Sequence, residues 1–189
     1  MRKFVPAYEG NLRKHALSVP RCISECSGIR VFGRRIKSLV FSTDVAIIKN
    51  INADAIIAVY PFTPQPAITQ AIIGVSEVPV FCGVGGGLTN GVRSASMAAY
   101  VEHQGAYGVV CNSKIGVETI HAIQPYLTAG VDIINVSGAA RTPEIVGALR
   151  QRYPELPIIA TGGPTEESIR ATIQAGANAI TYTPPSNGQ

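Results

Sequence analysis

Long apolar runs are missing from this chain of 189 residues, although 46% of its residues are hydrophobic. Charged residues such as Asp44, Lys49, Asp54 and Glu77 interrupt the apolar runs before any approaches the ~20 residues that a membrane-spanning helix needs. The apolar part of the first six residues is too short for a secretory signal. We therefore expect a soluble cytoplasmic protein without a membrane partner.

The sequence also lacks the cysteine and histidine spacings of metal sites. Its four cysteines form no paired zinc pattern, and Cys82 and Cys111 stand in apolar, strand-like runs where a thiol behaves as a small hydrophobe. The three histidines, His15, His103 and His121, share no ligand spacing with acidic residues or cysteines. We expect reduced thiols, no metal and no cofactor.

Excess positive charge is confined to the N-terminal fifth of the chain. Residues 1–37 hold nine Lys or Arg against Glu9 and Glu25, whereas the remaining residues carry more acids than bases. Such an arm can recruit phosphates, nucleic acid or an acidic neighbouring subunit. Because no aromatic ladder, helix-turn-helix or RNA-recognition signature accompanies it, a solvated face or a subunit contact is favoured over nucleic-acid binding.

Short apolar runs rich in Val, Ile and Ala recur from residue 36 onward, separated by helical stretches. Their continuous apolar character is typical of parallel strands that are covered on both faces, and their spacing fits repeated strand-helix units. The seven predicted strands are residues 36–42, 55–60, 78–82, 106–111, 131–136, 156–160 and 178–182. Residues 1–36 are predicted to be a basic segment packed on, or leading into, a body formed by residues 37–189, within one domain.

The repeated units predict an α/β fold, a compact and trimmed (β/α)₈ barrel with parallel strands, because 189 residues is below the usual size of a full barrel. Val5 or the segment 28–33 is a candidate for the missing strand. A doubly wound open sheet is the competing architecture, but the chain lacks the Gly-x-Gly-x-x-Gly opening of that fold.

Proline and glycine mark several predicted helix boundaries. Thr63 and Thr142 are predicted N-caps, each followed by a proline at the first helical position. The helix at residues 45–52 should be barely two turns long. Gly130 and Gly176 are expected just beyond helix ends, where a left-handed backbone is common.

The carboxyl ends of parallel strands meet at one mouth, and two residues there are candidates for catalysis. Lys114 follows a buried strand, so partial desolvation would let it form a Schiff base or act as an acid, unless it simply faces solvent from a loop. Asp44 offers a carboxylate that can serve as a general base or, alternatively, cap the next helix. The residues predicted to bind a ligand are Gly85, Gly86, Gly87, Asn112, Asn135, Ser137, Thr161, Gly162, Gly163, Thr183 and Ser186.

Gly162 and Gly163 end the strand at residues 156–160, where glycine lets the main chain approach an anion closely. We expect unencumbered main-chain amides near residue 162 to hold a phosphate or carboxylate. The alternative is that the two glycines only turn the chain out of the strand.

The segments 159–163 and 175–180 resemble the ribulose-phosphate-binding barrel superfamily, which includes aldolases, thiamine phosphate synthase and sugar-phosphate epimerases. The resemblance implies that Gly162 and Gly163 help to grip a phosphate. In place of the glycine-containing last loop of that superfamily, this chain has Tyr182-Thr183-Pro184-Pro185-Ser186, whose prolines remove two amide donors.

Two functions follow from these features. The first is an enzyme of the aldolase, lyase, isomerase or epimerase type that acts on a small phosphorylated or carboxylated metabolite. The second is a ligand-sensing regulatory barrel, similar in plan to antiterminator-like proteins, whose basic arm contacts RNA or a protein. Because a trimmed barrel leaves apolar surface uncovered, we also expect a homo-oligomer with the N-terminal segment at the contact.

Overall fold

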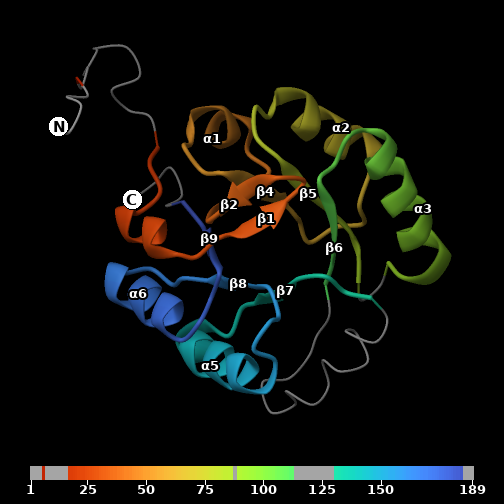
Figure 1. Cartoon of the computed structure of the whole chain (residues 1–189). Coiled ribbons are helices and arrows are strands. Elements are labelled where there is room, and N and C mark those ends of the chain that lie inside the picture. The colour runs from red at the N-terminus through yellow and green to blue at the C-terminus, as the bar shows by residue number, and fades with distance from the viewer. Residues whose placement is uncertain (1–5, 7–16, 87–88, 113–129, 185–189) are drawn as a thin grey trace.

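The computed structural model describes residues 6, 17–86, 89–112 and 130–184 and has an α/β fold built on a curled parallel sheet (Figure 1). Seven described strands form this sheet in the order β6-β5-β4-β3-β9-β8-β7, and each neighbouring pair is parallel. They are β3 (Ser38–Phe41), β4 (Ala55–Ala58), β5 (Val80–Gly85), β6 (Gly108–Cys111), β7 (Ile134–Val136), β8 (Ile158–Thr161) and β9 (Ala179–Tyr182). The predicted fold, a trimmed barrel of parallel strands, is confirmed.

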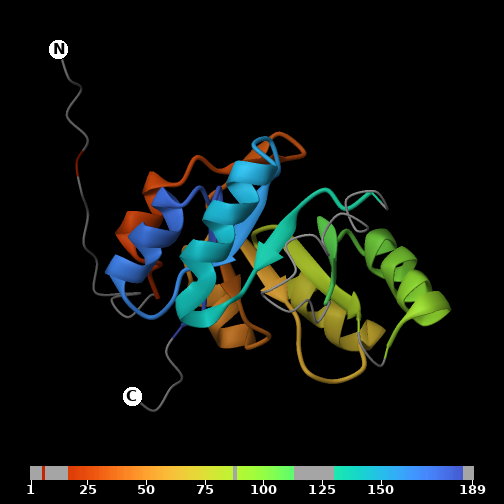
Figure 2. The ribbon, with the colours of Figure 1, turned by 90° about the horizontal axis from the view of Figure 1, so that it is seen from below.

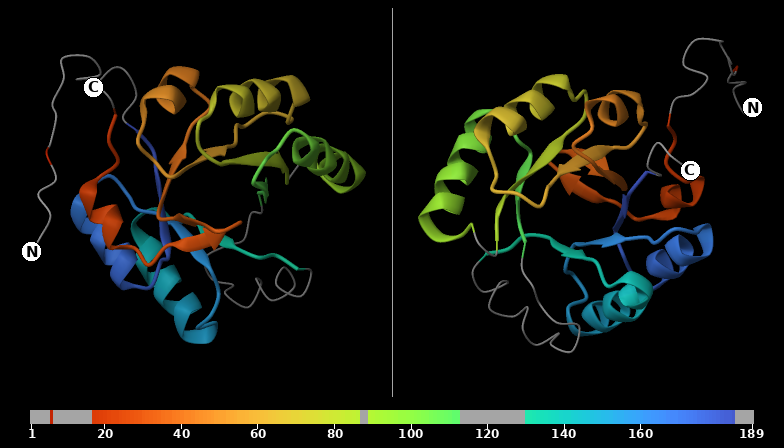
Figure 3. Two further views of the ribbon diagram at one scale, coloured as in Figure 1. Left: turned by 45° about the horizontal axis from the view of Figure 1, so that its top comes forward. Right: turned by 180° about the vertical axis from the view of Figure 1, so that it is seen from behind.

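Helices cover the outer side of the curled sheet in two groups (Figures 1 and 3). The first group, α1 (Val45–Asn50), α2 (Pro66–Val75) and α3 (Gly91–His103), packs on β3, β4 and β5 through residues such as Ile48, Ile72 and Met97. The second group packs on β7, β8 and β9 and consists of the 3-10 helix η1 (Arg21–Glu25) with α5 (Thr142–Arg152) and α6 (Glu166–Gln174); a further 3-10 helix, η3 (Ala139–Arg141), contacts α5. None of the helices in the described ranges is long and apolar enough to cross a membrane.

The inner side of the sheet encloses a separate apolar core that includes Leu39, Ile57, Phe81 and Ile159. A two-stranded antiparallel hairpin, β1 (Ile29–Val31) with β2 (Arg34–Ile36), packs against this core and lies at the centre of the ring in Figure 1. Figure 2 shows the hairpin turn at the top of the molecule. Since β2 leads directly into the amino end of β3, the hairpin lies at the end of the barrel where the strands begin. The barrel mouth at the carboxyl ends therefore lies on the opposite side from the hairpin.

The segment 28–33 does not supply the missing barrel strand, because its strand pairs only within the hairpin. Val5, the other candidate, lies outside the described residues. Of the described strands, β6 pairs only with β5 and β7 pairs only with β8, so no ladder joins the two edges of the sheet.

Two predicted helix starts are wrong. Helix α2 begins at Pro66 with Gln65 as its N-cap, since a residue before proline is disfavoured in the helical region and Gln65 is extended. Thr142 is itself helical and Arg141 is the N-cap of α5; the Thr142 hydroxyl accepts from the Gly138 amide and donates to the Ala139 carbonyl. Gly176, by contrast, follows α6 with φ +112° as predicted.

Two polar side chains at the amino ends of the strands tie neighbouring strands together. The Asp54 carboxylate accepts from the amides of Lys37 and Ser38, at 2.8 and 3.0 Å. On the other half, the Asn178 carbonyl oxygen accepts from the Ile158 amide at 2.9 Å. These bonds tie adjacent strands at the end that carries no predicted site residue.

Candidate functional site

Two threonines face the barrel interior near the carboxyl ends of β8 and β9. Ile159 and Ala179 belong to the inner core, and side chains alternate along a strand, so Thr161 and Thr181 point to the same inner side. The two are direct partners in the β8–β9 register. Ile133, directly before β7, packs on the same inner core, so the alternation of side chains places Asn135 of β7, and Ser137 directly after it, on this side as well. Four small polar side chains on or directly beside three adjacent strands therefore share one face.

Thr181 is the member of this group that the sequence did not single out. Thr181 is 4% exposed, and its hydroxyl oxygen is buried and has no hydrogen-bond partner among the described residues. A buried polar group without a partner costs about 1–3 kcal/mol, so an exception of this kind needs an explanation. Thr161 is half-buried, whereas Asn135 and Ser137 are exposed. The alternation of side chains along Ala179-Ile180-Thr181 is the sequence pattern that could have indicated an inward-facing Thr181.

The expectation of an unencumbered amide at Gly162 is wrong. This amide donates to the Thr181 carbonyl at 3.3 Å and so extends the β8–β9 ladder. Gly162 is buried, and a Cβ there would lie 2.7 Å from Ile169 and 2.8 Å from Ile180. Its lack of a side chain serves the packing of α6 on the sheet.

The start of α6 is likewise occupied by the chain itself. Thr165 and Ser168 form a reciprocal capping box, and Pro164 has no amide hydrogen to offer. The first turn carries Glu166 and Glu167, and hydrogen bonds to its own backbone and to Thr165 lower the pKa of the Glu167 carboxyl. Because these carboxylates already complement the helix dipole, an anion gains little at this helix end. The amide of Gly163, which has φ +82°, makes no hydrogen bond within the described residues.

The glycine-rich loop after β5 is packed against neighbouring backbone. The Gly86 amide donates to the Thr89 carbonyl at 2.7 Å, and the Gly85 carbonyl accepts from the Asn112 amide at 2.9 Å. A Cβ on Gly86 would come within 1.8 Å of the Asn112 carbonyl oxygen. Both glycines are thus required by a close backbone crossing, and Gly87 lies outside the described residues.

Asp44 is the N-cap of α1, the alternative that the sequence left open. Its Oδ1 accepts from the amides of Ala46 and Ile47 at 2.8 and 3.2 Å. Thr183 and Asn112 are exposed at the carboxyl ends of β9 and β6. Lys114 and Ser186, also predicted as site residues, lie outside the described residues.

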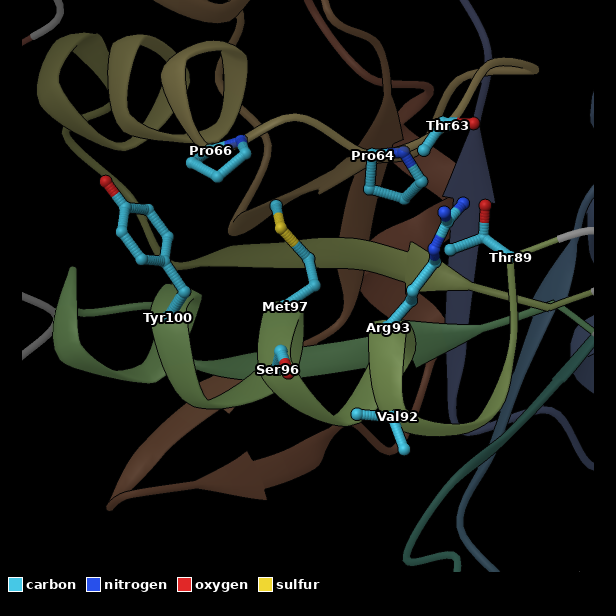
Figure 4. A pocket seen from close by; sticks show the side chains of 9 residues that line it. All are labelled: Thr63, Pro64, Pro66, Thr89, Val92, Arg93, Ser96, Met97 and Tyr100. Atoms are coloured by element: carbon cyan, nitrogen blue, oxygen red, sulfur yellow. The ribbon is translucent and has the colours of Figure 1, made fainter.

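The carboxyl ends of the strands form the rim of the barrel mouth. A pocket of about 450 Å³ lies on the outer side of this rim, between α2 and α3 (Figure 4). We call it the rim pocket. Arg93 points toward Thr63 and Thr89 at one end, Met97 lies in the middle, and Tyr100 stands at the other end beside Pro66. It is lined by Thr63, Pro64, Pro66, Thr89, Val92, Arg93, Ser96, Met97 and Tyr100. None of these residues is among those that the sequence predicts to bind a ligand.

In the ranges that the structure describes, no three His, Cys, Asp or Glu side chains gather closely enough to hold a metal ion. The polar groups that face the interior are hydroxyls and an amide, which suit hydrogen bonding to an anion better than coordination of a cation.

Comparison with known proteins gives a fold and two short sequence matches. No family model matches the chain. The inosine-5'-monophosphate dehydrogenases of Chlorobaculum tepidum and Chlorobaculum parvum are each 33% identical to it, over 70 and 66 residues. These matches cover 35% and 33% of this chain but only 14% and 13% of the relatives, so the chain corresponds to a small part of either enzyme.

Two similar solved structures are a monomeric variant of dihydrodipicolinate synthase and the thiamine phosphate pyrophosphorylase of Pyrococcus furiosus. Both superimpose with a TM-score of 0.51 over 77% of this chain, covering 68% and 84% of their own chains, at 11% and 14% identity. At such low identity the likeness concerns the fold, and it agrees with a trimmed barrel.

Proposed function

We propose that this protein binds a small phosphorylated or carboxylated metabolite at the inner carboxyl end of its barrel and acts on it as a lyase or an isomerase. The observation that carries the proposal is the Thr181 hydroxyl, which is buried, has no partner in the part of the chain that the structure describes, and faces the interior beside Thr161. A ligand oxygen there would remove the cost of leaving this group unpaired.

The neighbouring groups suit an anion. Thr161 on β8, Asn135 on β7 and Ser137 directly after β7 add donors, and the Gly163 amide offers another close to Thr161. Hydroxyl and amide donors can hold phosphate or carboxylate oxygens without a nearby cation, as anion sites built on backbone amides do. This arrangement moves the anion from the expected cluster of main-chain nitrogens at residue 162 toward the side chains of the inner face.

The comparisons support the class of ligand. Inosine-5'-monophosphate dehydrogenase and thiamine phosphate pyrophosphorylase are both named for phosphorylated compounds. Membership of the ribulose-phosphate-binding superfamily, which the segments 159–163 and 175–180 resemble, is part of this proposal.

For the chemistry, we keep Lys114 as the proposed Schiff-base or acid group, because it follows the exposed carboxyl end of β6. Asp44 is the weaker candidate. Since its Oδ1 is used by two amides of α1, proton transfer would fall to Oδ2.

Binding is tested by isothermal titration with inorganic phosphate and with pyruvate. Thr181→Val removes the hydroxyl while keeping the shape of the side chain, so we expect at least tenfold weaker binding and an unchanged or higher melting temperature. Thr172→Val is the matched control: this buried hydroxyl donates to the Ser168 carbonyl at 2.8 Å, so its loss should destabilise the fold and leave affinity unchanged. Equal affinities of the wild-type protein and Thr181→Val would refute the inner anion site.

The enzyme assignment has its own test. Borohydride reduction in the presence of pyruvate should give a stable adduct at Lys114, which peptide mass spectrometry locates. Asp44→Asn keeps a side chain that can cap α1, so a lower adduct yield in this folded variant would assign proton transfer to Asp44. If anion binding is intact but Lys114 forms no adduct, the protein would be a binding protein and not a lyase.

A regulatory barrel is a second candidate, favoured by one feature of the hairpin. Arg30 and Arg35 are direct cross-strand partners there, which places two like charges on neighbouring strands, and Arg30 donates to the Gly33 carbonyl at 3.4 Å while Arg35 donates to the Ser27 carbonyl at 2.7 Å. The ring of Phe32, at the turn, is 85% exposed. RNA binding that falls steeply with salt and is lost in the variant Arg30→Ser/Arg35→Ser would support this function, and salt-independent or absent binding would exclude it.

A further inference from the structure

We propose that the rim pocket is a second ligand site, which binds a small anion with an aromatic or short aliphatic body. Its anionic group would lie against Arg93, Thr63 and Thr89, and its body would extend along α3 toward Tyr100. This inference does not depend on the inner site proposed above.

Arg93 lies at a position where the local electrostatics disfavour a positive charge. It lies in the first turn of α3, where the helix dipole disfavours a cation and no acidic residue offsets it. Within the described residues, Arg93 makes no hydrogen bond or ion pair. In Figure 4 its guanidinium approaches the side chains of Thr63 and Thr89, which come from two different loops at the rim. A guanidinium with two hydroxyls beside it matches the donor set that a carboxylate or phosphate requires.

The remainder of the pocket is apolar. Pro64 and Pro66 form one wall. Met97, which is 7% exposed, points from α3 toward these prolines, and Tyr100 closes the far end. A thioether and a tyrosine ring both make favourable contacts with aromatic groups. At about 450 Å³ the pocket falls within the range of ordinary ligand sites, and one ring with an acidic substituent fits it.

The apolar surface around the opening supports a ligand site. Val92 and Tyr100, which both line the pocket, are 83% and 41% exposed. Large apolar side chains grouped around a pocket mark a binding surface more often than isolated ones do. The unpaired charge of Arg93 in this setting selects an anionic occupant.

The two sites lie on opposite sides of the sheet. Met97 belongs to the outer core, between the helices and β3–β5, whereas Thr161 and Thr181 lie on the inner face. Changes at one site should therefore leave the other intact, and the two proposals can fail separately.

The probe is phenyl phosphate, titrated into the ¹⁵N-labelled protein and followed by amide chemical shifts. Saturable shifts are expected for α3 and for the loop before α2, and Arg93→Gln should weaken binding at least tenfold. The matched control is Arg34→Gln, an exposed arginine on the hairpin, which should bind as the wild type does. Tyr100→Ala should weaken binding of phenyl phosphate more than that of inorganic phosphate, because only the former has a ring to contact.

Thr181→Val separates this inference from the inner site, since it should leave the shifts in α3 unchanged. Shifts confined to β8 and β9 would overturn the rim site while supporting the inner one. Absence of saturable binding, or equal affinity of the Arg93→Gln variant, would also overturn it.

Discussion

Gly162 and Gly163 are neighbours with different physical roles. Gly163 has φ +82°, a left-handed conformation that disfavours any residue with a Cβ. Gly162 has no such backbone requirement, but the side chains of Ile169 and Ile180 fill the space that its own would need. At the residue scale, the same amino acid therefore serves a turn at one position and close packing at the next.

Gly162→Ala should destabilise the fold by about 1–3 kcal/mol, because overpacking forces α6 away from the sheet. Gly147→Ala is the control. Gly147 lies within α5, and a Cβ there has no neighbour within 4 Å, so alanine should stabilise the helix by about 0.5–1 kcal/mol. Urea unfolding measures both free energies, and a neutral Gly162→Ala would show that the glycine is not needed for packing.

The buried thiols should lower the stability of the folded protein at alkaline pH. Burial raises the pKa of Cys26 and of Cys82 to about 11 each, above the value of about 8.5 for a free thiol. Between these two values the unfolded chain has lost thiol protons that the folded chain keeps, so the free energy of unfolding should fall as the pH rises from about 9 to about 11.

Thiol labelling provides the control for that pH profile. Only Cys111 is exposed, so one thiol per chain should react with Ellman's reagent at neutral pH and the other three only after unfolding. Replacing both Cys26 and Cys82 by alanine should flatten the decline in stability between pH 9 and pH 11. An unchanged slope would assign the decline to other groups.

At the scale of elements, Arg150 joins α5 to the segment that connects α6 with β9. Its guanidinium donates to the Gly176 carbonyl at 2.8 Å, to the Leu156 carbonyl at 2.9 Å and to the Asn178 side chain at 2.8 Å. Asn178 in turn accepts from the Ile158 amide at the start of β8. This network fixes the amino ends of β8 and β9, and through them the register that places Thr161 opposite Thr181.

Arg150→Ala should cost about 2 kcal/mol or more, because it leaves part-buried carbonyl groups without donors. Arg150→Lys should recover only a fraction, since an ammonium group lacks the planar fork that reaches several acceptors. Arg152→Ala, an exposed change in the same helix turn, should cost less than about 1 kcal/mol. Thermal unfolding ranks the three variants, and equal losses for Arg150→Ala and Arg152→Ala would contradict the role of the network.

At the scale of the whole molecule, the described sheet has two edge strands. On and beside β6, the side chains of Tyr107 and Val109 are 36% and 48% exposed, and the ring of Phe32 meets that of Tyr107 at 5.7 Å. Edge strands with exposed apolar side chains tend to pair with other chains. We propose this surface, which includes Phe32 of the N-terminal segment, as the contact of the predicted self-association.

Sedimentation velocity should show an oligomer of the full chain, and Val109→Lys should shift it toward the monomer, because a lysine on an edge strand opposes pairing. Val45→Lys, on helix α1 and 45% exposed in the wild type, should leave the assembly unchanged. Deletion of residues 1–16 tests the contribution of the N-terminal segment. A monomeric full chain at high protein concentration would rule the assembly out.

The sequence by itself determined the seven barrel strands and their parallel direction. Continuous runs of Val, Ile and Ala are buried on both faces only in such a sheet, and this signal is local to each run. It also indicated the cap at Asp44 and the turn at Gly176, because both depend on a few consecutive residues. The starts of α2 and α5 were misplaced by one or more residues, since competing prolines and a back-bonding hydroxyl decided between neighbouring positions.

The tertiary structure alone decided which groups remain available to a ligand. The Gly162 amide is used because Thr181, nineteen residues away, presents a carbonyl to it, and Gly86 is required because Asn112 passes close to it. In the same way, Thr181 stands out only because no described residue bonds to its hydroxyl, and Arg93 only because Thr63 and Thr89 from two loops lie beside it. The composition of each local run indicates a parallel strand, but the partners of a polar group are set by contacts between residues far apart in the chain.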